Sequence, residues 1–131
     1  MMKKIRLSAP GTRIPPKMYS QAVLYDGIVY VSGQLGRHPE DGHLDPDAEG
    51  QIRQTFKMVK AILENAGSSL ENILSCQLFL SNKEDLPILN KVYEELLGKM
   101  EIPPARCCIC CESVVEGCLF EMTCTAYVDK E

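Results

Sequence analysis

The sequence has 131 residues, of which 18 are acidic and 14 are basic, and its formal net charge is −4. This length is typical of one compact domain, so we treat residues 1–131 as a single domain in which residues 1–18 form a lead-in segment. The acidic balance, without a cluster of Lys and Arg among aromatic residues, argues against a nucleic-acid partner. No apolar stretch approaches the roughly 20 residues of a membrane helix, and we expect a cytoplasmic protein without a membrane partner.

The first predicted elements are a hairpin and a helix. Residues 19–33 contain two β-branched and aromatic runs around an Asp-Gly dipeptide, which favours a tight antiparallel turn. Asp45 and Pro46 are the predicted N-cap and first residue of a helix that ends at Gly67. Apolar residues recur along this helix at the spacing of a single stripe: Ile52, Phe56, Val59, Leu63 and Ala66.

The rest of the chain is predicted to contain a strand, a second helix and two further strands. Residues 74–81 alternate in polarity, which predicts a strand with Leu74, Cys76, Leu78 and Leu80 on its apolar face. The helical stripe returns over residues 86–97 and stops before two consecutive prolines. In residues 118–128 every even position is apolar, which predicts a strand with two distinct faces.

The predicted order is therefore strand, strand, helix, strand, helix, strand, strand, which indicates an α+β fold. Two amphipathic helices can cover only one face of such a sheet. Leu119 and Tyr127 lie on the other face of the last strand, beside Glu121. Because apolar side chains on that face are better covered by another subunit than by water, we expect a homo-oligomer.

Seven cysteines are present, and six of them lie between positions 107 and 124, which favours reduced thiols in an intracellular compartment over a disulfide framework. Cys107 with Cys110, and Cys108 with Cys111, have a spacing that occurs in zinc and thiol redox sites. On a strand the two members of each pair point to opposite faces. We therefore favour thiols that fill a buried strand, with zinc binding and redox chemistry as the alternatives.

His38 and His43 flank a predicted turn over residues 39–42 and could form a pair of metal ligands. Turn histidines are usually solvated, and we identify no cluster of carboxylates or thiols that would complete a site. The expectation is that this pair holds no metal.

Arg106 and Glu121 are the candidate residues for substrate binding and catalysis. Arg106 begins a strand directly after Pro-Pro-Ala, and Glu121 lies mid-strand on the uncovered face, where an unpaired carboxylate is costly. A guanidinium can hold a substrate carboxylate through two hydrogen bonds, and a carboxylate can orient or deprotonate water. If the two side chains meet, the pair would suit hydrolysis of a small acid.

Several short motifs then make the resemblance to a family specific. They are Tyr19-Ser20-Gln21-Ala22-Val23, Val31-Ser32-Gly33-Gln34, Ala66-Gly67, Asn90-Lys91-Val92-Tyr93, Pro104-Ala105-Arg106 and Glu121. With these motifs in this order, the chain resembles the Rid family of reactive intermediate deaminases, which is also called the YjgF or endoribonuclease L-PSP family. The similarity extends from about Tyr19 to Val128. The resemblance implies a chorismate-mutase-like sheet with two helices on one face, assembled as a homotrimer with a site between each pair of subunits.

The reaction that the resemblance implies is hydrolysis of reactive 2-imino acids, such as 2-iminopropanoate and 2-iminobutanoate, to 2-oxo acids and ammonia, without a cofactor or metal. Arg106 would bind the substrate carboxylate, while Glu121 and the backbone carbonyl of Cys108 would position the attacking water. Three further residues would line the cleft and orient the substrate: Tyr19, Ser32 and Asn90.

The chain departs from the family pattern at the mouth of this cleft, where Pro16-Lys17-Met18 replaces the usual Gly-Pro before the tyrosine. A different loop there would alter substrate preference. Two other functions stay open at this point. One is a trimeric module that binds 2-oxo acids without turnover, and the other is a ribonuclease or translation inhibitor, as one of the family's names suggests.

Overall fold

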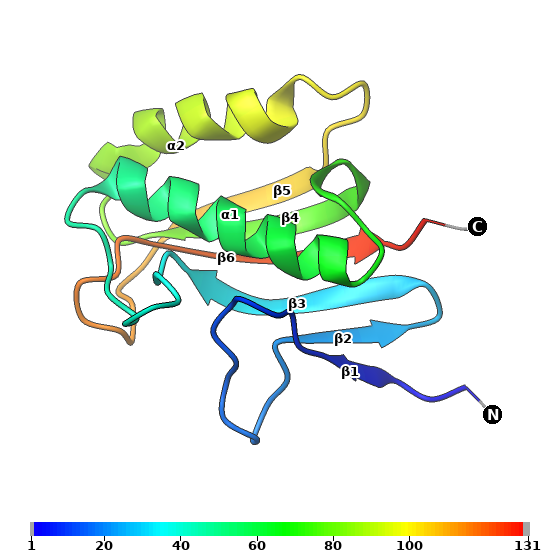
Figure 1. Ribbon diagram of the computed structural model, residues 1–131. Coiled ribbons are helices and arrows are strands. Elements are labelled where there is room, and N and C mark those ends of the chain that lie inside the picture. Colours follow the sequence, from blue (N-terminus) through cyan, green and yellow to red (C-terminus); the bar gives the residue numbers. More distant parts are fainter. Residues whose placement is uncertain (1, 130–131) are drawn as a thin grey trace.

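The computed structural model describes residues 2–129. Six strands form one sheet in the order β1-β2-β3-β6-β4-β5, and helices α1 and α2 lie side by side on one face of it (Figure 1). The strands are β1 Ile5–Leu7, β2 Ala22–Tyr25, β3 Ile28–Leu35, β4 Ile73–Leu80, β5 Ala105–Cys110 and β6 Phe120–Tyr127. The helices are α1 Ala48–Asn65 and α2 Leu86–Tyr93, and α2 continues into a π-helical turn at Glu94–Gly98. The α+β fold with two helices on one face is confirmed.

The predicted hairpin is formed by β2 and β3, which pair antiparallel from Tyr25 and Ile28 outward. Asp26 and Gly27 have φ values of 50° and 75°, as a two-residue turn between twisted strands requires. The predicted element order is incomplete, however, because β1 in the lead-in segment pairs antiparallel with β2 and adds a strand at one edge.

Helix α1 begins two residues later than predicted. Its N-cap is Asp47, so Asp45 and Pro46 belong to the preceding loop. Gln51, which is 1% exposed, donates from Nε2 to the backbone oxygen of Asp45 at 2.8 Å and thereby fixes that loop to the helix. The end is as predicted, because Gly67 has a φ of 83° and follows the last turn.

The core lies between the sheet and the helices. Ile52, Phe56, Val59 and Leu63 of the predicted α1 stripe are all buried there. In β4 the prediction fails at Leu74, which is 46% exposed, because the pairing with β6 is irregular between positions 73 and 75 and turns Ile73 into the core instead. None of the helices within residues 2–129 is long and apolar enough to cross a bilayer.

The two strands at the end of the chain differ in their surroundings. The even positions of β6 are buried against the helices, as the alternation predicted, and the odd positions face away from them. Strand β5 pairs in parallel with β4 alone and therefore has a free edge. The position of β5 at this edge decides how its cysteines and its arginine are exposed.

Candidate functional site

Arg106 lies on the helix face of the edge strand β5. It is paired with Cys76 of β4, whose side chain is buried under the helices. The Nη2 atom of Arg106 donates to Oδ1 of Asn90 at 2.8 Å, and its Cζ atom lies 4.7 Å from the ring centroid of Tyr93. Both partners come from α2. Two of the predicted residues, Arg106 and Asn90, are thus in direct contact.

The Arg106 guanidinium is exposed and oriented. Within residues 2–129 no acidic side chain forms an ion pair with it. The amide of Asn90 and the ring of Tyr93 hold one side of the guanidinium, which leaves its other N–H donors facing solvent. A planar cation fixed in this way is suited to a carboxylate ligand. Tyr93 was not among the predicted site residues, although it belongs to the same motif as Asn90.

Glu121 lies on the opposite face of the sheet, next to β3. The carboxylate of Glu121 lies against the backbone of Gly33, so closely that the Cβ atom of any other residue at position 33 would overlap it. Pairing between β3 and β6 is interrupted between Val31 and Gln34, so the backbone bulges beside this carboxylate. Burial raises the pKa of Glu121 above its ordinary value. A half-buried acid with a raised pKa is the kind of group that serves in proton transfer.

One chain does not bring Arg106 and Glu121 together. Strand β6 is separated from β5 by β4, and Glu121 is level with Phe79 whereas Arg106 is level with Cys76. The two side chains also point to opposite faces. Any site that uses both of them must therefore combine groups from two chains.

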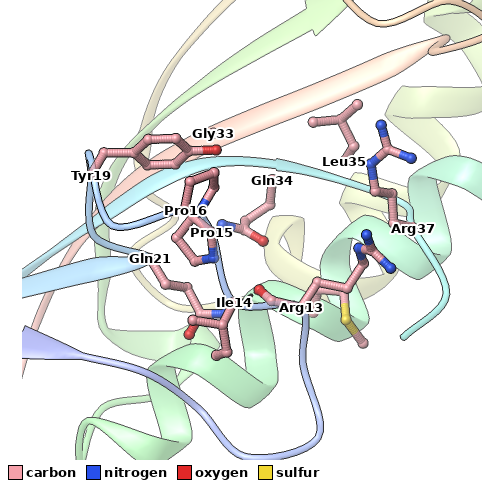
Figure 2. Close-up of a pocket in the computed structure, with 11 residues that line it drawn as sticks. Arg13, Ile14, Pro15, Pro16, Tyr19, Gln21, Gly33, Gln34, Leu35 and Arg37 are labelled. Carbon is pink, nitrogen blue, oxygen red and sulfur yellow. Dashed lines mark hydrogen bonds between the residues drawn. The ribbon is translucent and has the colours of Figure 1, made fainter. Parts of the chain in front are cut away.

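Ser32 lies within β3, and Tyr19 lies in the segment just before β2 that Ser32 contacts. The hydroxyl of Ser32 donates to the backbone oxygen of Ser20 at 2.6 Å, which fixes the segment that carries Tyr19. Tyr19 lines a cavity of about 200 Å³ together with Gly33 and the lead-in prolines (Figure 2). Arg13 and Arg37 also line this cavity, and no motif or spacing in the sequence pointed to either of them.

The comparisons with known proteins identify the family. The model of the endoribonuclease L-PSP family matches residues 11–128. The chain belongs to this family. It is 37% identical over 100 residues to a RutC family protein of Aquifex aeolicus, an alignment that spans 76% of this chain and 80% of the relative.

Two solved structures of the L-PSP (Rid) family have the same fold. A putative endoribonuclease L-PSP from Entamoeba histolytica is 31% identical, with a TM-score of 0.88 over 96% of this chain and 100% of that one. A protein of the conserved Rid family from Yersinia pestis is 29% identical, with a TM-score of 0.90 over 96% and 100% of the two chains. The resemblance to the Rid family is confirmed.

The cysteines of this L-PSP chain are placed differently from the prediction. Cys107, Cys110 and Cys111 are exposed rather than packed, because β5 lies at the sheet edge and the chain leaves it immediately afterwards. Cys108 alone of the four packs against the core, and burial raises the pKa of its thiol. A raised pKa opposes thiolate formation, which makes the Cys108 sulfur a poor nucleophile and a poor metal ligand.

The expectation that no carboxylates lie beside His38 and His43 is also wrong. His38 and His43 have carboxylate neighbours within their own loop. Oδ1 of Asp45 accepts from Nε2 of His38 at 3.1 Å, and Asp41 lies against His43. The sequence contained both acids, but the fold of the loop is what brings them to the rings.

Proposed function

We propose that this protein is a homotrimeric hydrolase that converts reactive 2-imino acids to 2-oxo acids and ammonia. The observation that carries the proposal is the Arg106 guanidinium, which is oriented by Asn90 and Tyr93 and has no acidic partner within residues 2–129. Such a group recognises the carboxylate that every 2-imino acid carries. Family membership supports the same assignment.

The chemistry requires little beyond positioning. Arg106 binds the carboxylate, and Glu121 with the backbone carbonyl of Cys108 orients a water molecule toward the imine carbon. The water oxygen forms a bond to that carbon and loses a proton, and the nitrogen gains protons. The carbon–nitrogen bond of the tetrahedral intermediate then breaks, which yields the 2-oxo acid and ammonia. A protonated imine is electrophilic, so this route needs no covalent nucleophile.

The location of the site between chains follows from the separation of the two groups. The free edge of β5 presents Arg106, and the face without helices presents Glu121 (Figure 1). Tyr30, Ile109 and Tyr127 are 49%, 48% and 42% exposed on that same open face. These side chains are suited to contact with neighbouring subunits. Tyr19 and Ser32 would then border the cleft from the chain that supplies Glu121.

The experiment that tests the proposal is a coupled assay. A pyridoxal-phosphate-dependent threonine or serine dehydratase generates the imine, and formation of the 2-oxo acid is followed with and without the protein. We expect the wild type to accelerate hydrolysis and Arg106→Ala to remove the acceleration. Binding of a 2-oxo acid without acceleration would favour the non-catalytic module instead.

Ribonuclease activity is the second candidate because the matching family model carries that name. A net charge of −4 gives little attraction for RNA phosphates. Salt-sensitive RNA cleavage by the pure protein, lost in Arg106→Ala, would favour this candidate over the deaminase.

A further inference from the structure

We propose that the loop between β3 and α1 binds a zinc-like divalent ion through His38, His43 and Asp45, with Asp41 supporting His43. This site is separate from the residues assigned to imine hydrolysis.

The three ligand atoms already lie close together. All of them fall within 4.8 Å of one another. Oδ1 of Asp45 is 3.1 Å from Nε2 of His38 and 3.8 Å from Nε2 of His43. Zinc bonds of about 2.0–2.2 Å in tetrahedral geometry place two ligand atoms roughly 3.3–3.6 Å apart. Small side-chain rotations would therefore make room for an ion at the centre of the cluster.

The two imidazole rings are stacked, and each places its Nε2 atom near Asp45. Their centroids are 4.2 Å apart and their planes differ by 9°, so both Nε2 atoms approach one carboxylate oxygen of Asp45. Two protonated rings would repel each other in this arrangement. Because the lone pair of Nε2 lies in the ring plane, the two rings must tilt from this stacked arrangement to point at one centre. After that rotation a single cation satisfies both nitrogens and the oxygen at once.

Asp41 provides the outer support that metal-binding histidines usually have. Its Oδ1 atom lies 2.6 Å from Nδ1 of His43 and accepts from the backbone N–H of the same residue at 3.0 Å. This contact places the ring proton on Nδ1 and leaves Nε2 free as a ligand. Carboxylate support of this kind orients the ring and increases its basicity toward a metal.

The loop that carries these residues is held in place by its own backbone. Gly42 donates its N–H to the oxygen of His38 at 2.7 Å, and His38 donates to the oxygen of His43 at 3.0 Å. Asp45 is fixed from the core side by the buried Gln51. Because the ligands are held in advance, little conformational entropy is lost when an ion binds.

The charge and exposure of the loop also suit a cation. Glu40, Asp41 and Asp45 give it three negative charges, against two guanidinium groups: that of Arg37 donates to the backbone oxygen of Gly42 at 2.9 Å, and that of Arg13 packs against Gly42. The side chains of His38 and Asp45 are 26% and 30% exposed, so solvent water can fill the remaining coordination position. Three protein ligands with one water are common for accessible zinc ions.

The test is a zinc titration by calorimetry on the full, untagged chain. Zinc also binds thiols, so the parent protein for this test carries Cys107→Ser, Cys110→Ser and Cys111→Ser. We expect one zinc per chain, at least about tenfold weaker binding for His43→Ala and His38→Ala, and about 10- to 100-fold weaker binding for Asp41→Asn. Asp47→Asn, which changes an acid outside the cluster, serves as the matched control and should bind as the parent does.

A second measurement, of thermal stability, distinguishes a variant that has lost zinc binding from one that has failed to fold. Zinc should raise the Tm of the parent and of Asp47→Asn, and it should leave the Tm of a folded Asp45→Asn variant nearly unchanged. Absence of zinc uptake by the parent would overturn the proposal. Equal affinity in the parent and both histidine variants would overturn it as well, because the ion would then bind elsewhere.

Discussion

Replacement of Arg106 by lysine tests the role of the guanidinium while the positive charge is kept. The guanidinium is held by one hydrogen bond to Asn90 and by the ring of Tyr93, and an ammonium cannot keep this orientation and also bind a carboxylate through two parallel N–H groups. Loss of one hydrogen bond to a charged group costs about 1.5–3 kcal/mol, which corresponds to a kcat/KM about 10- to 150-fold lower.

The dehydratase-coupled assay measures this change directly, with 2-oxo acid formation as the signal. Arg53→Lys is the matched control, because Arg53 is also exposed but pairs with Glu49 and Glu95 away from the proposed site. The substitution should leave stability nearly unchanged. The free energies of unfolding of Arg106→Lys and the wild type should differ by no more than about 0.5 kcal/mol, as for other surface substitutions, and their Tm values should be close. Full activity in Arg106→Lys would refute the argument that two-pronged carboxylate recognition drives the reaction.

Three other substitutions give distinct outcomes. Burial raises the pKa of Glu121, so kcat/KM should decrease once the pH drops below this raised pKa, at a higher pH than for an ordinary carboxyl. Glu121→Gln should remove this acid limb of the pH profile. The same desolvation opposes the ionised form in the folded state, so chemical denaturation should show Glu121→Gln to be more stable than the wild type at neutral pH. This difference should begin to shrink as pH falls through the raised pKa of the folded state, and it should vanish below the ordinary pKa that the carboxyl has in the unfolded chain. Gly33→Ala should displace the Glu121 carboxylate and lower activity with little change in Tm, since only the end of a flexible side chain must move; unchanged activity would contradict the placement of that carboxylate in the site. Gln51→Ala should cost about 1–3 kcal/mol in urea unfolding, because it removes a buried side chain that donates to the backbone oxygens of Asp45 and Gly117 and accepts from the N–H of Leu119.

The fold was predictable where a local pattern is repeated over several residues. The alternation across residues 118–128 indicated which side of β6 would be buried, and the α1 stripe indicated the face that packs on the sheet. Strand β1 was missed because three residues are too few for any period to be visible. The wrong face at Leu74 has a similar cause, since a bulge changes the period and depends on the partner strand.

The candidate site was predictable as residue types but not as an arrangement. Arg106 and Glu121 stand out from their strands by charge, yet only the register of the paired strands shows that they lie on different faces. The exposed thiols of Cys107 and Cys110 were assigned to the core because a run of small apolar residues looks the same in an edge strand and in a central one. The histidine cluster depends on a turn that stacks two rings, which no spacing rule predicts.

The most direct test of the account uses mixed trimers of Arg106→Ala and Glu121→Gln chains. Each variant alone should be inactive. If every site takes its guanidinium from one chain and its carboxylate from the next, random mixing at equal ratio should restore about a quarter of the sites, because a closed trimer then contains interfaces with both groups intact. We predict this recovery after the two variants are unfolded and refolded together, and none after they are refolded separately and combined. Persistent inactivity of the mixed trimers would contradict the claim that the two groups meet between chains.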